Sequence, residues 1–321
     1  MLPRAPSFWQ DMDSLWAKAL SPLSCLYLAG HRVHQTFMTP YTSRLPVICI
    51  GNAIVGGSGK TPAVIALIHL LRETGMARHP VILTRGYGGS LKGPTYVDHE
   101  KHSYKDVGDE ALLLACHAPV IVCADRGAGA RLAELGEADI LILDDGLQNN
   151  TLQKTLSLLV VDADYGFGNG KVLPAGPLRE PLEDAMAKAA AVICVNGFMP
   201  LDKPQFESLI MAMPLEKRPF VAFAGIGQPE KFRRTLEQQG IDLAGWHAFA
   251  DHHPYKEAEL NKLLQESEKK GAQLITTEKD YIRLPESFQN KVRTLPIEMI
   301  FPGKDRLAAF LSEQLNASRH E

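Results

Sequence analysis

Several features that define other classes of protein are absent from this sequence or scarce in it. No apolar run approaches the roughly 18–20 residues of a transmembrane helix. Acidic residues stand near the start, where a secretory signal would need its apolar core. A net charge of −3 argues against a dedicated nucleic-acid-binding protein. We therefore expect a protein that stays inside the cell and binds no nucleic acid.

Cysteine is also scarce, and its placement excludes two further kinds of site. The five cysteines are Cys25, Cys49, Cys116, Cys123 and Cys194. Their number is odd, no two of them form a Cys-x-x-Cys pair, and three fall within predicted buried strands. This pattern predicts reduced core thiols in the cytosol, not a disulfide framework or a zinc site.

What the chain does contain is a globular composition with regularly alternating elements. Of its 321 residues, 45% are hydrophobic and 22% are charged, which allows two domains with separate cores. Short apolar runs alternate with helix-period segments, as is typical of a parallel sheet with helices on both faces. We expect an N-terminal amphipathic helical segment (1–40), a doubly wound, mostly parallel, P-loop kinase-like α/β domain (41–200), a proline-rich linker (201–218) and a smaller C-terminal α/β domain (219–321).

The first α/β domain is predicted to begin with a phosphate-binding loop. A strand (45–50) leads through a glycine-rich turn into Lys60, Thr61 and a long apolar helix. Glycines leave backbone N–H groups free to contact phosphate oxygens, Lys60 adds positive charge, and the Thr61 hydroxyl can hold Mg²⁺. The loop is longer than the standard pattern, which would have glycine in place of Ile54. The predicted nucleotide-binding residues are Asn52, Gly56, Gly57, Ser58, Gly59, Lys60 and Thr61.

A second buried strand (140–143) ends in two aspartates, Asp144 and Asp145. Beside a P-loop, one such carboxylate reaches Mg²⁺ directly or through water. Gln148 follows three residues later and is close enough to share the metal shell. The sequence does not say which of the two aspartates contacts the metal.

Other polar residues also fall at strand ends, where doubly wound sheets place their sites. Asp109 and Glu110 begin a helix, either as site residues or simply as acidic residues that favour a first helical turn. Arg179 lies in an irregular passage (165–181), and passages of this length are usually functional. His252 follows Asp251 in a loop of the C-terminal domain, where the pair either serves a site or hydrogen-bonds its own loop. The residues alone leave these alternatives open.

The N-terminal segment has two interpretations. Apolar residues recur at helix spacing between residues 7 and 37, and Pro22 is expected to begin a second helical segment. The helix either packs on the main domain, or is interfacial, with its aromatic and leucine face entering a membrane surface.

In their order along the chain, eight motifs resemble those of the tetraacyldisaccharide 4′-kinases of the lipid A pathway. The motifs are GNAIVGGSGKTP, RGYGG, GDE, DDGLQ, GNGKVLPAGPLRE, AGIGQPEKF, DHHPY and TTEKD. The resemblance implies that ATP, with Mg²⁺, phosphorylates the 4′-hydroxyl of a tetraacylated glucosamine disaccharide 1-phosphate, forming the 4′-phosphorylated lipid A precursor. It also implies a peripheral protein on the cytoplasmic face of the bacterial inner membrane, which we expect to be a monomer.

The resemblance also assigns roles to single residues. It implies that Asp109 is the catalytic aspartate, that His252 is its partner and that Arg179 is the arginine of the family's LRE motif. The candidate catalytic residues are therefore Asp109, His252, Lys60 and Arg179, and the candidate metal-site residues are Thr61, Glu110, Asp144, Asp145 and Gln148. Two positions depart from the family's pattern. Asn149 stands where histidine is common, so a ligand role for that histidine does not carry over, and Ala111 stands where proline is common.

Two other functions are compatible with a P-loop. One is an ATPase or GTPase that metallates or switches a partner protein, and the other is a nucleotide-dependent membrane-targeting module without transfer chemistry. Neither would produce a phosphorylated sugar lipid, and the ordered motifs favour the kinase. No Asn-Lys-x-Asp guanine motif and no adenine signature is present, so the residues do not specify the nucleotide base.

Overall fold

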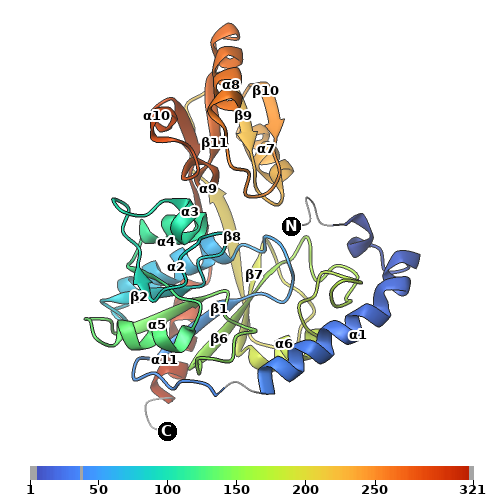
Figure 1. Ribbon diagram of the computed structural model, residues 1–321, viewed down its shortest axis with the longest axis vertical. Helices are drawn as coiled ribbons and strands as arrows, with labels where there is room; N and C mark the ends of the chain where they lie inside the picture. Colours follow the sequence, from blue (N-terminus) through green and yellow to red (C-terminus); the bar gives the residue numbers. More distant parts are fainter. Residues whose placement is uncertain (1–5, 37–38, 318–321) are drawn as a thin grey trace. The chain divides into compact units, whose positions relative to one another are not determined.

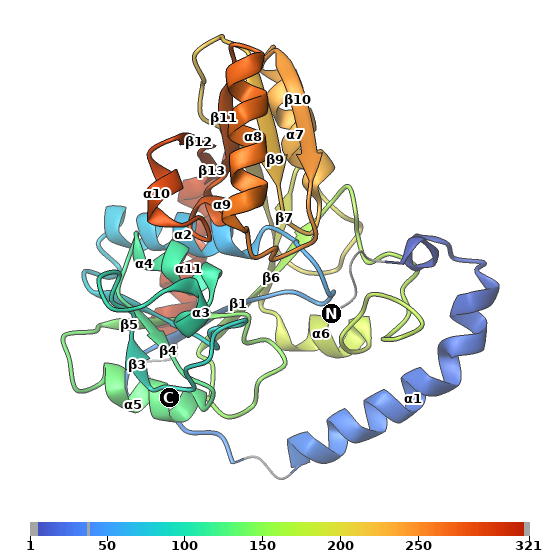
Figure 2. The same cartoon turned by 45° about the horizontal axis from the view of Figure 1, so that its top comes forward.

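The computed structural model describes residues 6–36 and 39–317 (Figures 1 and 2). The described residues group into two compact units, a larger one (6–210 and 299–317) and a smaller one (211–298). Both units are built from alternating strands and helices. The predicted α/β fold class is confirmed.

Within the described residues, the principal sheet has nine strands in the order β13-β8-β7-β6-β1-β5-β2-β4-β3. Strand β1 lies near its centre, parallel to β5 on one side and to β6 on the other, and the short β3 runs antiparallel to β4. The strands are β1 (Val47–Gly51), β2 (Pro80–Thr84), β3 (Thr95–Tyr96), β4 (Val120–Val122), β5 (Ile140–Asp144), β6 (Leu156–Asp162), β7 (Ala191–Val195), β8 (Gln205–Ala212) and β13 (Ile297–Ile300).

Strands β1 and β5 are buried along their whole length because helices cover both faces of the sheet. Helix α2 (Lys60–Glu73) contacts both strands, and α4 (Asp109–Ala115) and α11 (Lys304–Ala317) contact α2. The apolar core of the other face includes alanines of α5 (Arg126–Ala133) and α6 (Leu182–Lys188). A short helix, α3 (Tyr104–Val107), precedes α4.

The first two elements that the structure describes are a short 3-10 helix, η1 (Ser7–Gln10), and a long helix, α1 (Leu15–Thr36). The prediction that Pro22 begins a second helical segment is wrong, because α1 continues through it. Pro22 has no N–H to donate within the helix, while the neighbouring Ser21 hydroxyl bonds back to the Ala17 carbonyl oxygen at 2.8 Å. No helix in the described part of the chain combines the length and apolarity needed to cross a bilayer.

The N-terminal segment packs against the irregular passage 165–181 through one side only. Trp9 is buried and its Nε1 donates to the carbonyl oxygen of Pro174 at 3.2 Å, and the Ser24 hydroxyl donates to that of Val172 at 2.7 Å. The other side keeps an exposed apolar face, which consists of Met12, Leu15, Trp16, Leu23, Leu26, Tyr27 and Val33. These positions recur at helix spacing.

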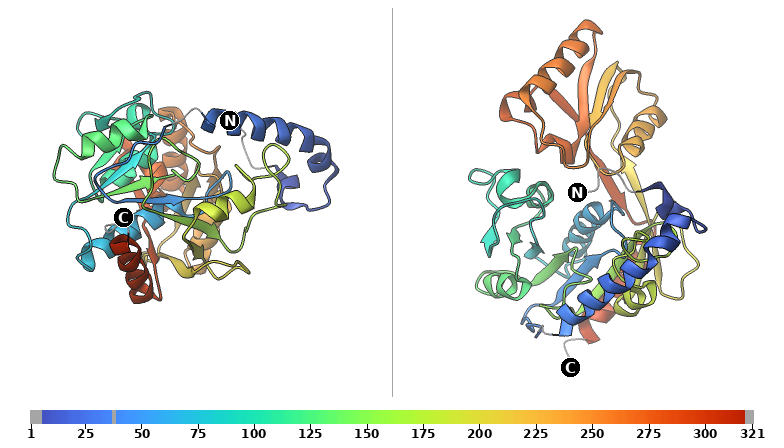
Figure 3. Two further views of the ribbon diagram at one scale, coloured as in Figure 1. Left: turned by 90° about the horizontal axis from the view of Figure 1, so that it is seen from below. Right: turned by 45° about the vertical axis from the view of Figure 1, so that its right-hand side comes forward.

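The smaller unit has a parallel four-stranded sheet in the order β10-β9-β11-β12. Alternate residues of β9 point to opposite faces: Phe220 belongs to the core on the α7 side, and Phe223 to the core on the α8 side. Figure 3 (right) shows one of these helices on each face. The elements are β9 (Phe220–Ala224), α7 (Pro229–Gln238), β10 (Leu243–Ala248), α8 (Glu257–Lys269), β11 (Gln273–Thr277), α9 (Glu278–Tyr281), α10 (Glu286–Gln289) and β12 (Val292–Leu295).

The segment expected to be a linker (201–218) contains strand β8, whose alternating burial includes Phe206 and Ser208. Helix α11, at the end of the expected C-terminal domain, groups with the larger unit. The Phe206 and Phe310 ring centroids lie 5.2 Å apart, which joins α11 to β8. Such contacts between distant parts of the chain are not visible in a local sequence pattern.

Candidate active site

The predicted phosphate loop connects the end of β1 to the start of α2. Asn52 is fully buried, and its side-chain amide donates to Ser58 Oγ at 3.0 Å and to the Gly56 carbonyl oxygen at 3.4 Å. Gly59 precedes α2 with φ of 86°, a left-handed conformation that favours glycine. Among the residues that the structure describes, no side chain caps this helix, so its first N–H groups are available to an anion.

Asp144, the last residue of β5, and the following Asp145 lie beside this loop, because Asp144 pairs in register with Ile50 of β1. The Thr84 hydroxyl donates to Asp144 Oδ2 at 3.0 Å. Arg179 Nη1 donates to both carboxylate oxygens of Asp145, at 2.9 and 3.0 Å, and Lys60 Nζ lies 3.6 Å from Asp145 Oδ1. The structure therefore gathers the predicted residues Lys60, Asp144, Asp145 and Arg179 at one edge of the sheet.

The pKa values of the two neighbouring carboxylates are shifted in opposite directions. Burial, together with the charges of Glu110 and Asp145, raises the pKa of Asp144 to about 7. Burial also acts to raise the pKa of Asp145, but Lys60 and Arg179 outweigh it and hold that pKa below its ordinary value. These influences favour the protonated form of Asp144, and a bound cation would act in the opposite direction, towards the carboxylate.

A magnesium ion fits the chemistry of this edge. In the part of the chain that the structure describes, no three Asp, Glu, His or Cys side chains converge as a ready-made metal site. Mg²⁺ in nucleotide sites usually takes only one or two carboxylates and completes its shell with water and phosphate oxygens. Asp144 and Glu110, with the hydroxyl of Thr61 in the first turn of α2, are donors of the required kind.

The raised pKa of Asp144 gives a testable pH dependence. Without metal, Asp144 keeps its proton in the folded protein up to about pH 7, whereas in the unfolded chain it loses the proton near pH 4. The free energy of unfolding therefore decreases as pH rises from about 4 to 7. Asp144→Asn stays neutral and can still accept the Thr84 hydrogen bond. In EDTA, we expect the stability of the variant relative to wild type to increase as pH rises from about 4 to 7, measured by chemical denaturation. A stability difference that does not change with pH would show that Asp144 is ionised throughout.

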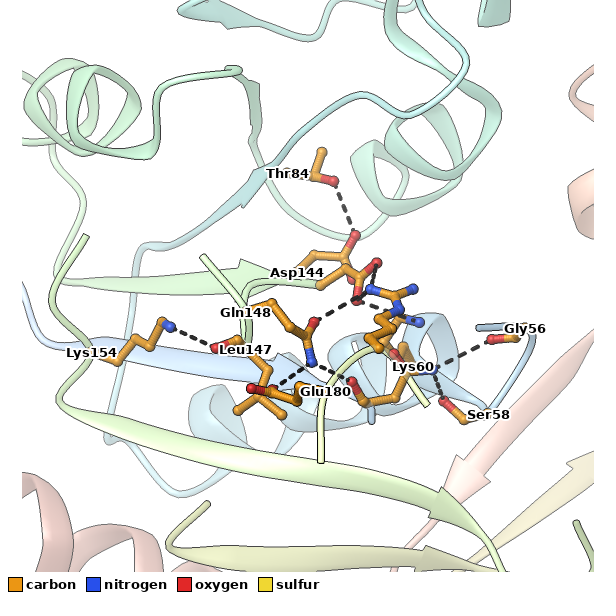
Figure 4. A network of polar contacts seen from close by, with 12 residues as sticks. Gly56, Ser58, Lys60, Thr84, Asp144, Leu147, Gln148, Lys154 and Glu180 are labelled. Carbon is orange, nitrogen blue, oxygen red and sulfur yellow. Dashed lines mark hydrogen bonds and ion pairs between the residues drawn. The ribbon is translucent and has the colours of Figure 1, made fainter. Parts of the chain in front are cut away.

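Gln148 connects the phosphate loop to the Arg179 segment. Its amide nitrogen donates to the Asn52 carbonyl oxygen and to Glu180 Oε1, both at 3.0 Å, and its oxygen accepts from Arg179 at 3.5 Å. Glu180 is itself buried and forms an ion pair with Lys188 (Figure 4 shows Gln148 beside Glu180). The metal role of Gln148 stays a prediction, because its described contacts are to the protein.

Asp109 is the first residue of α4, and its side chain is buried. Its Oδ1 accepts the Glu110 N–H at 2.9 Å. The RGYGG segment (85–89) packs backbone to backbone against the turn before α4: a Cβ at Gly89 would lie 2.5 Å from the Asp106 carbonyl oxygen, and a Cβ at Gly108 would lie 2.4 Å from the Tyr87 carbonyl oxygen. The motif thus fixes the turn that presents Asp109.

Arg126 interacts electrostatically with the carboxylates of the candidate site, and the sequence interpretation did not single it out. It begins α5, is 3% exposed, and its guanidinium donates to the carbonyl oxygens of Cys123 and Ala124. Burial lowers its pKa, while the charges of Asp144 and Asp145 act in the opposite direction. Its position after β4, at the carboxyl end of another strand, is the signal that could have identified it.

His252 lies in the smaller unit, in the loop after β10. Its φ of 55° is unusual for a residue other than glycine. Its N–H donates to the Gly225 carbonyl oxygen at 3.0 Å. A joint role of His252 with Asp109, which is in the larger unit, stays a prediction.

The fold and the site together define a P-loop phosphoryl-transfer protein. The defining features are a parallel sheet with a glycine-rich loop, a lysine at the start of the following helix, and carboxylates at the end of the adjacent strand. Residues 16–316 match the family described as tetraacyldisaccharide-1-P 4′-kinase (LpxK). The tetraacyldisaccharide 4′-kinase of Rhodospirillum centenum is 42% identical, with 98% of this chain and 97% of the relative covered. That of Bradyrhizobium sp. is 45% identical, with 88% and 85% covered.

A solved structure, LpxK from Aquifex aeolicus in complex with ATP, aligns with a TM-score of 0.77 at 28% identity and covers 93% of this chain and 99% of that one. The chain belongs to the tetraacyldisaccharide-1-P 4′-kinase family.

Proposed function

We propose that this chain transfers the γ-phosphate of ATP, with Mg²⁺, to the 4′-hydroxyl of a tetraacylated glucosamine disaccharide 1-phosphate. The product would be the 4′-phosphorylated precursor of lipid A. The observation that carries the proposal is the joint placement of the phosphate loop, Lys60, Arg179 and the Asp144–Asp145 pair at one sheet edge, in a chain that matches the kinase family over residues 16–316.

The reaction requires that the two substrates be positioned for transfer and that negative charge on the transferred phosphoryl group be neutralised. The loop amides and Lys60 bind the phosphates, and Arg179 adds a second cation at the same carboxylate. When bound, Mg²⁺ supplies further neutralisation of the phosphate oxygens. Asp145 holds Lys60 and Arg179 in place, which restricts both cations before the nucleotide binds.

The acceptor hydroxyl must also lose its proton. In this proposal Asp109 takes that proton, because it is a carboxylate presented by a rigid turn at the start of α4. His252 assists by orienting Asp109 and sharing the proton. Its origin in the smaller unit makes closure of the two units a condition of catalysis.

A direct test is transfer of label from γ-labelled ATP to a detergent-dispersed tetraacyl disaccharide 1-phosphate, with and without Mg²⁺. Labelled lipid that depends on Mg²⁺ is the expected result. Release of labelled phosphate without labelled lipid would identify an ATPase and contradict the proposal.

We further propose that the protein is a monomer that binds peripherally to the cytoplasmic face of the inner membrane. The acyl chains of the substrate remain in a bilayer, so the enzyme must approach a lipid surface. The exposed apolar face of α1 supports this proposal, because it is continuous over several helical turns while the opposite side packs on the protein.

The membrane proposal predicts that Leu15→Ser, Trp16→Ser and Leu26→Ser together release the protein from lipid vesicles. Their side chains are more than two-thirds exposed, so burial of three such groups in lipid would contribute about 1.5–3 kcal/mol each. We expect vesicle co-sedimentation to fall at least about tenfold, with an unchanged midpoint of thermal unfolding. Leu135→Ser, at an equally exposed site away from α1, is the matched control. Equal losses for both variants would contradict the proposal.

A further inference from the structure

Three of the motifs in the smaller unit meet in one buried network. They are AGIGQ (224–228), DHHPY (251–255) and TTEKD (276–280). At its centre Asp280 is fully buried, and its Oδ1 accepts from the Gly225 N–H at 2.9 Å and from the Tyr255 hydroxyl at 2.7 Å. Its Oδ2 accepts from the Thr277 hydroxyl at 2.6 Å, and the carboxylate also forms an ion pair with Arg283.

The network holds Gly225 by both of its backbone groups. Asp280 accepts its N–H, while its carbonyl oxygen accepts from Arg283 Nη2 at 2.9 Å and from the backbone N–H of His252 at 3.0 Å. Asp280 and Arg283 therefore hold Gly225 through its N–H and its carbonyl oxygen respectively, and the His252 N–H donates to that same carbonyl oxygen. His252 is thus connected to the buried Asp280 carboxylate through Gly225 by two hydrogen bonds.

Tyr255 closes the same loop from the other end. Its ring packs edge-on against Phe223 and Phe249, with centroids 5.3 and 5.2 Å apart, and its hydroxyl reaches Asp280. The loop from Phe249 to Tyr255 is thus fixed at its beginning by the Ala224 carbonyl oxygen, which accepts the Phe249 N–H at 2.8 Å, and at its end by Asp280.

This arrangement accounts for the left-handed backbone of His252. A φ of 55° in a residue other than glycine persists only where the surrounding structure fixes it. Because the buried charges lie in a medium of low dielectric constant, their hydrogen bonds are strong and poorly exchanged for water. The network can therefore fix the orientation of the His252 side chain relative to the loop.

We propose that Asp280, with Tyr255 and Arg283, is a positioning residue that sets the orientation of His252 for the phosphoryl transfer. The inference rests on the proposed function, in which His252 assists Asp109. Asp280 does not contact the reacting atoms itself, and acts through the backbone of Gly225.

Two variants separate positioning from folding. Tyr255→Phe keeps the packed ring and removes only the hydroxyl that donates to Asp280, and Asp280→Asn keeps the shape and removes the charge. Tyr281→Phe is the matched control, because it removes a hydroxyl from the same core cluster outside the network of Asp280. We expect Tyr255→Phe to lower kcat about tenfold with KM for ATP unchanged and Tyr281→Phe to be normal, while Asp280→Asn lowers kcat further.

The decisive measurement is a double-mutant cycle with His252→Ala. If the network acts only through His252, Tyr255→Phe has no further effect on kcat once His252 is alanine. An equal fold-loss in both backgrounds would show a merely structural role and overturn the inference, as would a normal kcat for both Tyr255→Phe and Asp280→Asn.

A second readout does not depend on activity. Amide hydrogen exchange over residues 249–255 should accelerate in Tyr255→Phe and in Asp280→Asn but not in Tyr281→Phe, and unchanged exchange in the first two would overturn the inference. Failure of the proposed function has a different signature. The wild type would then produce no labelled lipid, or His252→Ala would keep the wild-type kcat, whatever the exchange measurements show.

Discussion

Asp109→Asn lowers kcat by about 10²–10⁴-fold while ATP affinity stays close to that of the wild type. The amide oxygen of asparagine can still accept the Glu110 N–H, as Asp109 Oδ1 does at 2.9 Å, so the first turn of α4 keeps its geometry. What the amide cannot do is take a proton from the sugar hydroxyl. The loss therefore falls on the chemical step and not on the binding of nucleotide, because the loop that binds phosphate belongs to another segment of the chain.

The measurements are kcat at saturating ATP and lipid, and the ATP dissociation constant from calorimetry. Asp109→Ala provides a second variant that also lacks the hydrogen bond to Glu110. Equal losses in the two variants would attribute the whole effect to the missing carboxylate, whereas a larger loss in the alanine variant would add a structural contribution. Turnover close to that of the wild type in Asp109→Asn would remove Asp109 from the proton transfer.

The parts of the site that were predictable from sequence are those specified within a few neighbouring residues. A strand, a glycine-rich turn and a lysine at the next helix start form a continuous pattern, so the phosphate loop was recognisable despite Ile54 at an expected glycine position. The same holds for Asp144 and Asp145, which follow an apolar strand. The parallel sheet then places both segments together, because the register of β1 and β5 pairs Ile50 with Asp144.

The parts that were not predictable depend on contacts across long stretches of sequence. Gln148 is bonded to Asn52 and to Glu180, and no local pattern shows that these three residues meet. The position of Arg126 after a strand was a possible signal, but its burial near the carboxylates depends on packing that no local pattern shows. The prediction for Pro22 also failed, since the N-terminal segment contacts the passage 165–181 on both sides of this proline, through Trp9 of η1 and Ser24 of α1.

Lys60→Ala is expected to weaken ATP binding and turnover together, in contrast to the Asp109 variants. The Lys60 side chain is 13% exposed and its ammonium group lies 3.6 Å from Asp145, so it is held where a phosphate would meet it. Loss of a hydrogen bond to a charged group costs about 1.5–3 kcal/mol, which corresponds to a loss of about 10–150-fold in ATP affinity.

The fold should survive this change because Arg179 still neutralises Asp145 through its two hydrogen bonds. Without Lys60, however, the pKa of Asp145 should rise towards its ordinary value, since Lys60 is one of the charges that lower it. The ATP dissociation constant and kcat would be measured together, with Lys304→Ala, which removes an exposed ion pair to Glu73, as the matched control. Normal ATP affinity with reduced kcat would mean that Lys60 acts only on the charge that develops during transfer. In that case Arg179 and the loop amides alone would account for the binding of the phosphates before the reaction.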